Sequence, residues 1–286
     1  MKKLLILSGK GGTGKTTIAG AFAKLLNARY IVDCDVEAPN LDLLFADIPM
    51  QKEKPYYSLP VARIDPETCI GCGKCQETCR FEAISAIDGK YQVDMRACEG
   101  CKACTLVCPV NAISMETYIG GTIYRSLGEP TIISAKLKPG TGSSGLLVTE
   151  VKKLLEPFQN ENEYAVIDGP PGIGCPVIAS LKNVDFALIV TEPSLSGVSD
   201  LKRVITMARQ FKAPMAIIIN KHDLHEGITK QIEVFAVSEH IPLIGKIPYD
   251  EKAILMLNRG MTIDQTTSEM SFVIKELLRK TVELMD

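Results

Sequence analysis

The segment Gly9-Lys10-Gly11-Gly12-Thr13-Gly14-Lys15-Thr16 decides the fold of this 286-residue chain. It matches the phosphate-loop pattern G-x-x-x-x-G-K-[ST]. The apolar residues 4–7 before it predict a strand, and residues 15–27 after it predict a helix. A glycine-rich loop between a strand and a helix is the context in which this pattern binds phosphate. A glycine turn with an incidental lysine is the weaker alternative, because every required position agrees.

The chemistry of this loop suits a nucleoside triphosphate. Its glycines let successive backbone N–H groups face phosphate oxygens, and the helix adds the positive end of its dipole. Lys15 is expected to neutralise the β- and γ-phosphates, and Thr16 to hold Mg²⁺ through its hydroxyl. The residues that we expect to bind nucleotide here are Gly11, Gly12, Thr13, Gly14, Lys15, Thr16 and Thr17.

Composition excludes several other classes of function. The chain is 46% hydrophobic and 23% charged, so it can bury a full core. Its net charge of −2 does not favour a nucleic-acid partner. No apolar run approaches the roughly 18 residues that a membrane span needs. Of the ten cysteines, most fall in two regular runs, which favours thiolate ligands in a reducing cytoplasm over disulfides.

Acidic and amide residues lie at or just after the ends of three predicted strands. Asp33 and Asp35 come after a strand at 29–33, Asp168 ends a strand at 164–168 before Gly169-Pro170-Pro171-Gly172, and Asn220 to Asp223 follow a strand at 216–219. The carboxyl ends of strands in open α/β sheets form the rim where ligands bind. Capping of a helix at 39–46 is an alternative role for Asp33 and Asp35.

Two cysteine runs interrupt this pattern. Cys69, Cys72, Cys75 and Cys79 have the spacing C-x2-C-x2-C-x3-C, and Cys98, Cys101, Cys104 and Cys108 repeat it with Pro109 following. This run resembles that of bacterial two-cluster ferredoxins. The resemblance implies one [4Fe–4S] cluster on Cys69, Cys72, Cys75 and Cys108, and a second on Cys98, Cys101, Cys104 and Cys79. Zinc would need only four ligands, so we disfavour it.

The remaining strand and helix pattern predicts a doubly wound, mostly parallel sheet. Further strands are expected at 130–135 and 185–191, and helices from 145 to about 156, at 196–211 and at 268–284. We predict a discontinuous P-loop domain over 1–55 and 120–286, an inserted two-cluster ferredoxin domain over 60–116, and a linking hairpin at 118–128. The last helix is amphipathic but its charges balance, which favours packing on the sheet over stable membrane association.

The loop sequence, with Lys10 before Gly11, resembles that of the deviant-Walker-A ATPases of the MinD and Mrp type. The resemblance implies that Lys10 acts across a dimer interface and that Asp35, in switch I, orients the attacking water. It also implies that Asp168, in switch II, contacts Mg²⁺ through water and that the Gly172 N–H senses the γ-phosphate. By the same resemblance Asn220 reads adenine and Pro248 lies in a second base-contacting loop. The presence of Asp223 leaves GTP as an alternative to ATP.

Together the motifs resemble a MinD-superfamily ATPase with an inserted ferredoxin domain. They predict a cytoplasmic protein with ATP or ADP, Mg²⁺ and two [4Fe–4S] clusters, in which a nucleotide-driven change is coupled to electron transfer. Its partners would be a second copy or a paralogue, and an unidentified redox or cofactor-accepting protein. An iron–sulfur or other metallocofactor assembly or carrier ATPase is the main alternative. A MinD-like positioning ATPase is a third.

Overall fold

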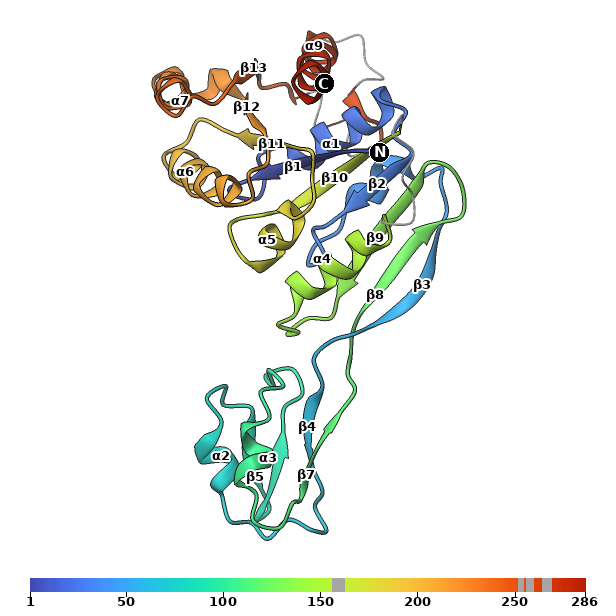
Figure 1. Ribbon diagram of the computed structural model, residues 1–286, viewed down its shortest axis with the longest axis vertical. Helices are drawn as coiled ribbons and strands as arrows, with labels where there is room; N and C mark the ends of the chain where they lie inside the picture. Colours follow the sequence, from blue (N-terminus) through green and yellow to red (C-terminus); the bar gives the residue numbers. More distant parts are fainter. Residues whose placement is uncertain (156–162, 252–254, 256–259, 264–268) are drawn as a thin grey trace.

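A nine-stranded sheet runs through the larger part of the molecule (Figure 1). This computed structural model describes residues 1–155, 163–251, 255, 260–263 and 269–286. Across the sheet the strands are β13 (Leu243–Ile247), β12 (Met215–Asn220), β11 (Phe186–Thr191), β1 (Lys2–Ser8), β10 (Tyr164–Pro171), β2 (Tyr30–Asp33), β9 (Thr131–Leu137), β8 (Ile119–Ser126) and β3 (Met50–Tyr57).

The seven strands from β13 to β9 are parallel, and β8 and β3 extend the sheet antiparallel. The prediction of a mostly parallel α/β sheet is confirmed. The central strands are continuous apolar runs because helices cover both of their faces. Residues 4–7 of β1, for example, have no exposed surface.

Helices form a layer on each side of the sheet. One core cluster joins it to α4 (Ser144–Lys153), α5 (Cys175–Leu181), α6 (Leu195–Gln210) and α7 (Glu226–Ser238). The other joins it to α1 (Lys15–Leu25), the 3-10 helix η1 (Leu41–Phe45) and α9 (Glu269–Met285). A short 3-10 turn, η2 (His222–Leu224), follows β12. The apolar face of α9 packs into the core, as predicted, and among the described residues no helix is long and apolar enough to cross a membrane.

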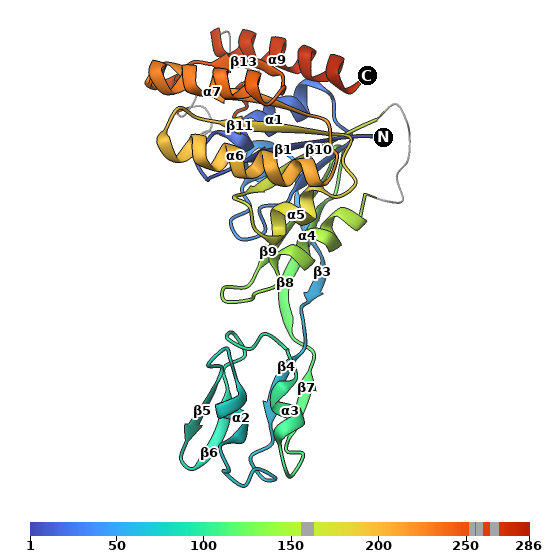
Figure 2. The ribbon, with the colours of Figure 1, turned by 60° about the vertical axis from the view of Figure 1, so that its left-hand side comes forward.

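A smaller unit lies apart from the sheet, joined to it by the chain segments after β3 and before β8 (Figures 1 and 2). Its elements are β4 (Val61–Ile64), α2 (Lys74–Thr78), β5 (Ile84–Ile87), β6 (Lys90–Val93), α3 (Ala103–Val107) and β7 (Ile113–Glu116). β4 pairs with β7 and β5 with β6, both antiparallel. Three of the cysteines are buried in its own core cluster, with Ala62, Ile64, Ile84 and Ala112.

Two local predictions differ from the structure. Residues 118–128 form no hairpin: β8 is one strand, and it pairs with β3 on one side and β9 on the other. Pro55 lies inside β3, at the sheet edge, where a residue without an N–H group is tolerated. The helix expected at 39–46 is shorter and of the 3-10 type. The end expected for the helix that begins at 145, near residue 156, lies outside the described residues.

The α4 helix allows a matched test of the core. Leu147 has no exposed surface, whereas 49% of its neighbour Leu146 is exposed. Leu147→Ala should lower the free energy of unfolding by about 2–5 kcal/mol, because a cavity remains against the sheet. Leu146→Ala should stay within about 0.5 kcal/mol of wild type. Urea unfolding followed by circular dichroism measures both, and equal effects would contradict the assigned faces of α4.

Candidate nucleotide site

The phosphate loop lies at the carboxyl edge of the sheet, between β1 and α1, and borders a cavity of about 400 Å³. Gly14 begins the helix with φ +86°, and the space that its Cβ would need is filled by the Asn220 amide, so a glycine is required there. The predicted residues that line this cavity are Gly11, Gly12, Thr13, Gly14, Lys15, Thr16, Thr17, Asp35, Asn220 and Pro248.

The buried carboxylate of Asp168 anchors the loop. It forms an ion pair with the Lys15 ammonium and accepts a hydrogen bond of 2.6 Å from the Thr16 hydroxyl. Asp168 has no exposed surface and Lys15 has 6%. β10 therefore brings a carboxylate to the two side chains that were predicted to hold phosphate and Mg²⁺. The sequence placed all three at one sheet edge but did not show that they contact one another.

Asp33 ends the strand next to β10 and is paired in register with Asp168. Its carboxylate accepts N–H groups of Asp35, Asn40 and Leu41, so it holds the turn into η1, although the N-cap residue of η1 is Asn40 and not Asp33. Burial and, second, the Asp168 charge raise the pKa of Asp33 to about 7. This residue is therefore a structural support of the site.

Asp35 and Gly172, the residues predicted for the two switches, differ in whether they face the cavity. Asp35 lines the cavity, and burial raises the pKa of its carboxyl group, as suits a group that handles a water. The N–H of Gly172 donates instead to the Ser8 carbonyl oxygen at 3.1 Å. This backbone donor must leave Ser8 before it can meet a phosphate.

The residues predicted to read the base have structural contacts of their own. Asn220 Nδ2 donates to the Thr13 carbonyl oxygen at 2.7 Å, so this amide fastens β12 to the phosphate loop. The carboxylate of Asp223 accepts the Tyr249 N–H at 2.8 Å and thereby holds the loop that contains Pro248. Pro248 and Tyr249 line the cavity.

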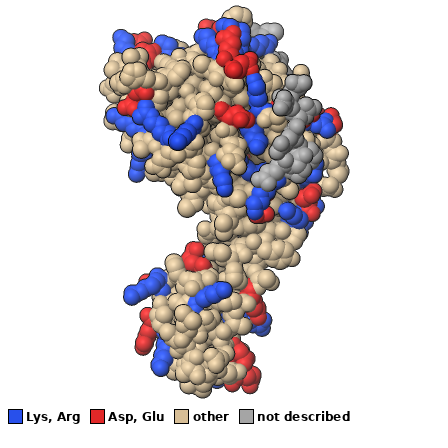
Figure 3. Space-filling view, viewed as in Figure 1, with Lys and Arg blue, Asp and Glu red and all other residues tan. Residues whose placement is uncertain are grey.

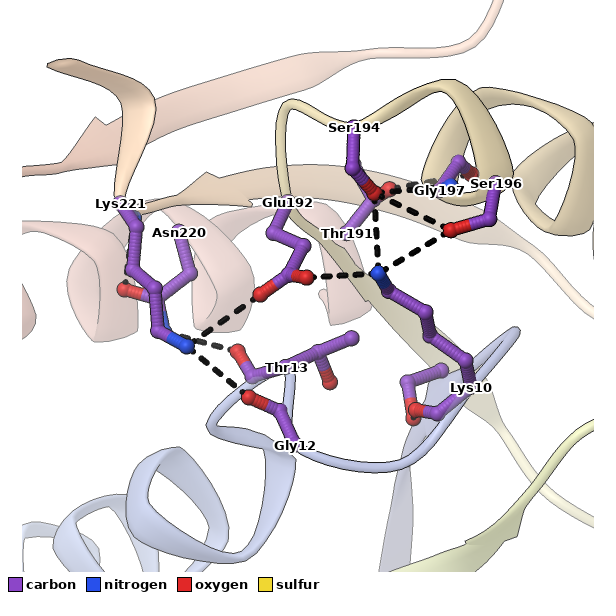
Figure 4. Close-up of polar contacts among 11 residues, drawn as sticks. Lys10, Gly12, Thr13, Thr191, Glu192, Ser194, Ser196, Gly197, Asn220 and Lys221 are labelled. Atoms are coloured by element: carbon purple, nitrogen blue, oxygen red, sulfur yellow. Dashed lines mark hydrogen bonds and ion pairs between the residues drawn. The ribbon is translucent and has the colours of Figure 1, made fainter. Parts of the chain in front are cut away.

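Lys10 is bound within its own chain (Figure 4). Its ammonium pairs with Glu192 at 2.7 Å and donates to the Ser194 and Ser196 hydroxyls. Lys221 binds the other Glu192 oxygen at 3.2 Å and the Gly12 carbonyl oxygen at 3.0 Å. Burial raises the pKa of Glu192, but hydrogen bonds from the two lysines outweigh it and the net shift is downward.

Sequence analysis missed both Glu192 and Lys221. Lys221 belongs to the quoted segment that follows β12, which is a usable signal, whereas no pattern marks Glu192. Lys10 must release Glu192 before it can reach a facing subunit.

The eight motif cysteines line two separate pockets of the small unit. One is lined by Cys69, Cys72, Cys75 and Cys108, the other by Cys79, Cys98, Cys101 and Cys104, each with apolar neighbours. All ten cysteines are free thiols. Among the described residues no group of three or more His, Cys, Asp or Glu side chains is arranged to hold a metal ion. Cluster binding therefore stays a prediction, although four thiols around an apolar pocket are the donor set that a cubane cluster uses.

The comparisons with known proteins agree with this site. Residues 4–263 match the model of the CobQ/CobB/MinD/ParA nucleotide binding domain. The chain belongs to this family. An uncharacterized protein of Methanocaldococcus jannaschii is 34% identical over 99% of this chain and 97% of its own length. An iron-sulfur cluster carrier protein of Pyrococcus abyssi is 24% identical, with coverage of 91% and 78%.

Among solved structures, the septum site-determining protein MinD of Pyrococcus horikoshii, complexed with Mg-ADP, is similar with a TM-score of 0.61. It is 18% identical, and the match covers 99% of this chain and 96% of that one. At this identity the likeness concerns the fold. The phosphate loop lies within the residues that match this nucleotide binding domain.

The raised pKa of Asp33 gives a pH-dependent stability. A carboxyl group with a raised folded pKa stabilises the fold below its unfolded pKa of about 4, and this contribution is lost as pH rises toward 7. Asp33→Asn removes the charge, so its stability relative to wild type should increase between pH 4 and 7, by a few kcal/mol in order of magnitude. Thermal melts of nucleotide-free protein measure this.

The exposed Asp47 provides the control, and Asp47→Asn should follow the wild-type profile. Any lost hydrogen bond of Asp33→Asn adds a constant offset, not a slope. Parallel pH profiles of Asp33→Asn and wild type would contradict the assigned pKa.

Proposed function

We propose that this protein hydrolyses ATP and couples the resulting conformational change to electron transfer through two [4Fe–4S] clusters. The observation that carries the proposal is the grouping of the eight cysteines into two apolar pockets, four in each, in a unit attached to a phosphate-loop domain. Each pocket takes three cysteines from one motif and the fourth from the other. This exchange is what the two-cluster ferredoxin pattern requires.

The surroundings of the cysteines would adjust the reduction potentials of such clusters as well as bind them. The Cys98 sulfur accepts the Ala62 N–H at 3.4 Å, and the Cys108 sulfur accepts the Ala112 N–H at 3.2 Å. Hydrogen bonds to ligand sulfurs stabilise the reduced state of a cluster. When bound, the clusters would supply one-electron transfer, for which Cys79, Cys98, Cys101 and Cys104 form one site and Cys69, Cys72, Cys75 and Cys108 the other.

The nucleotide site would perform hydrolysis by neutralising and positioning phosphate. Lys15 and Thr16 would transfer from Asp168 to the phosphates and Mg²⁺, and Asp168 would then hold the ion through water. Asp35, at the cavity wall, would orient the attacking water. Gly172 would exchange the Ser8 carbonyl for the γ-phosphate, which makes β10 the element that reports the nucleotide state.

Adenine is the base that we favour. The Asp223 carboxylate, the group that would recognise guanine, is held by the Tyr249 N–H and does not line the cavity. Asn220 lines it. Its amide oxygen accepts the Lys221 N–H and one amide hydrogen goes to Thr13, so the second hydrogen is the one that it would offer to a base.

A cluster-carrier function is the second candidate. It is favoured by the similarity to the Pyrococcus abyssi iron-sulfur cluster carrier protein and by the exposure of Cys72 and Cys101, one in each pocket. Exposed ligands allow an acceptor thiol to approach. In that function the clusters would be cargo.

Anaerobically purified protein should contain about eight iron atoms per chain, as two cubane clusters with reversible one-electron reduction. Iron analysis and EPR of the reduced protein measure this. Cys98→Ser should lose iron, whereas Cys175→Ser, at a cysteine outside both pockets, should retain it. One zinc per chain would exclude both candidates, and rapid transfer of iron to an apo-acceptor would favour the carrier.

Hydrolysis should require a dimer in which Lys10 acts on the facing subunit. Lys10→Ala and Asp35→Ala should each lose most of the ATPase activity. A mixture should regain part of it, because one of the two composite sites keeps both side chains. Phosphate release by the mixture measures this, and mixed dimers without recovery would exclude a lysine acting in trans. The same test applies to a heterodimer with a paralogue.

A further inference from the structure

The loop between β9 and α4, residues 138–143, reaches from the large unit to the small one (Figures 1 and 2). It shares a narrow crevice with residues 95–99 and with the linkers next to β4 and β8. A Cβ on Gly140 would lie 3.1 Å from the Arg96 Cβ, and one on Gly142 would lie 2.5 Å from the Glu99 Oε1. The two units are therefore in direct contact, beyond their covalent connections.

This contact is electrostatic as well as steric. Gly142 lies two residues before α4, so the Glu99 carboxylate is near the positive end of a ten-residue helix. Glu99 directly follows Cys98, which lines both the crevice and one cysteine pocket. None of the cysteines of the other pocket lines the crevice. One cluster site is thus adjacent to the large unit, and we call it the proximal site; the other is the distal site.

α4 is fastened to α5 at both ends. Near the end of α4, the partly buried Lys152 ammonium donates to the carbonyl oxygens of Ala179, Ser180 and Lys182 at the end of α5. A cation at this position also complements the α5 dipole. At the other end, a Cβ on Gly145 would lie 3.0 Å from the Cys175 Cβ and 3.1 Å from its backbone. The two helices must therefore shift together.

α5 also begins directly after the nucleotide-sensing segment. β10 carries Asp168, which holds Lys15 and Thr16, and four residues later Gly172 bonds to Ser8. Cys175, the first residue of α5, follows three residues after that. A change in the contacts of Asp168 and Gly172 would therefore displace the start of α5, and with it α4 and the loop before α4.

We propose that the paired helices α4 and α5 transmit the nucleotide state to the proximal cluster site by moving the α4 N-terminus relative to Glu99. A cluster held at the proximal site would then be the one whose potential responds to nucleotide. The inference rests on the proposed function. A carboxylate beside a cluster ligand contributes to the local charge that sets the reduction potential of the cluster. The position of the Glu99 carboxylate would therefore affect that potential.

Redox titration of the whole protein followed by EPR tests this, with Mg²⁺ plus ADP compared with a non-hydrolysable ATP analogue. Two variants first identify the clusters. Glu99→Gln removes a charge beside the proximal site and should raise the potential of one cluster. Glu67→Gln does the same near Cys69 of the distal site and should raise the potential of the other.

In wild type, the change of nucleotide should shift the potential of the Glu99-marked cluster only. Gly142→Ala, which displaces the Glu99 carboxylate, and Gly145→Ala, which forces α4 from α5, should each remove more than half of this shift. Gly128→Ala is the matched control, because nothing lies within 4 Å of its added Cβ, and it should retain the shift. Nucleotide binding should be unchanged in all three.

A second readout does not depend on the clusters. Hydrogen exchange of residues 94–100 should depend on nucleotide in wild type and Gly128→Ala, and lose that dependence in Gly145→Ala. No potential shift, an equal shift of both clusters, or a full shift in both Gly142→Ala and Gly145→Ala would overturn the inference. If Gly145→Ala does not fold, Gly142→Ala decides alone, since its Cβ meets only a movable carboxylate. A failure of the proposed function would be recognised separately, because the purified protein would then lack the expected iron.

Discussion

The ion pair between Lys15 and Asp168 determines the arrangement of the nucleotide site. Both side chains are almost completely buried, and a buried charge is tolerated when a partner of opposite sign compensates it. The pair joins the phosphate loop to the end of β10, and Thr16 adds a second bond to the same carboxylate. Any phosphate or metal ion that draws Lys15 and Thr16 away must therefore change the surroundings of β10.

The position of Asp33 adds to this constraint. It lies in register beside Asp168 and is equally buried, so two carboxylates compete for the positive charge of one lysine. The N–H groups that Asp33 accepts from the η1 turn compensate part of the cost. A divalent cation at this edge would relieve the remaining repulsion, which gives a physical reason for the site to favour a metal–nucleotide complex.

The small unit is attached at the opposite edge of the sheet from the loops that follow β12 and β13. β8 and β3 continue the sheet beyond β9, and the chain leaves them to form β4 and β7. On the face shown in Figure 3, acidic and basic side chains are interspersed on both units, so no single-sign field dominates there. The loop before α4 gives the small unit a second, non-covalent connection to the nucleotide domain.

The sequence by itself determined the phosphate loop, the individual strands of the parallel sheet and the two cysteine motifs, because each depends on residues that are close in the chain. Glycine spacing sets backbone conformation locally, and apolar runs of strand length require cover on both faces. The tertiary structure alone decided that β8 is one strand between β3 and β9, that Lys10 pairs with Glu192, and that Glu99 meets Gly142. These contacts join residues far apart in sequence, and their approach depends on how helices and strands pack, which no local pattern of residues records.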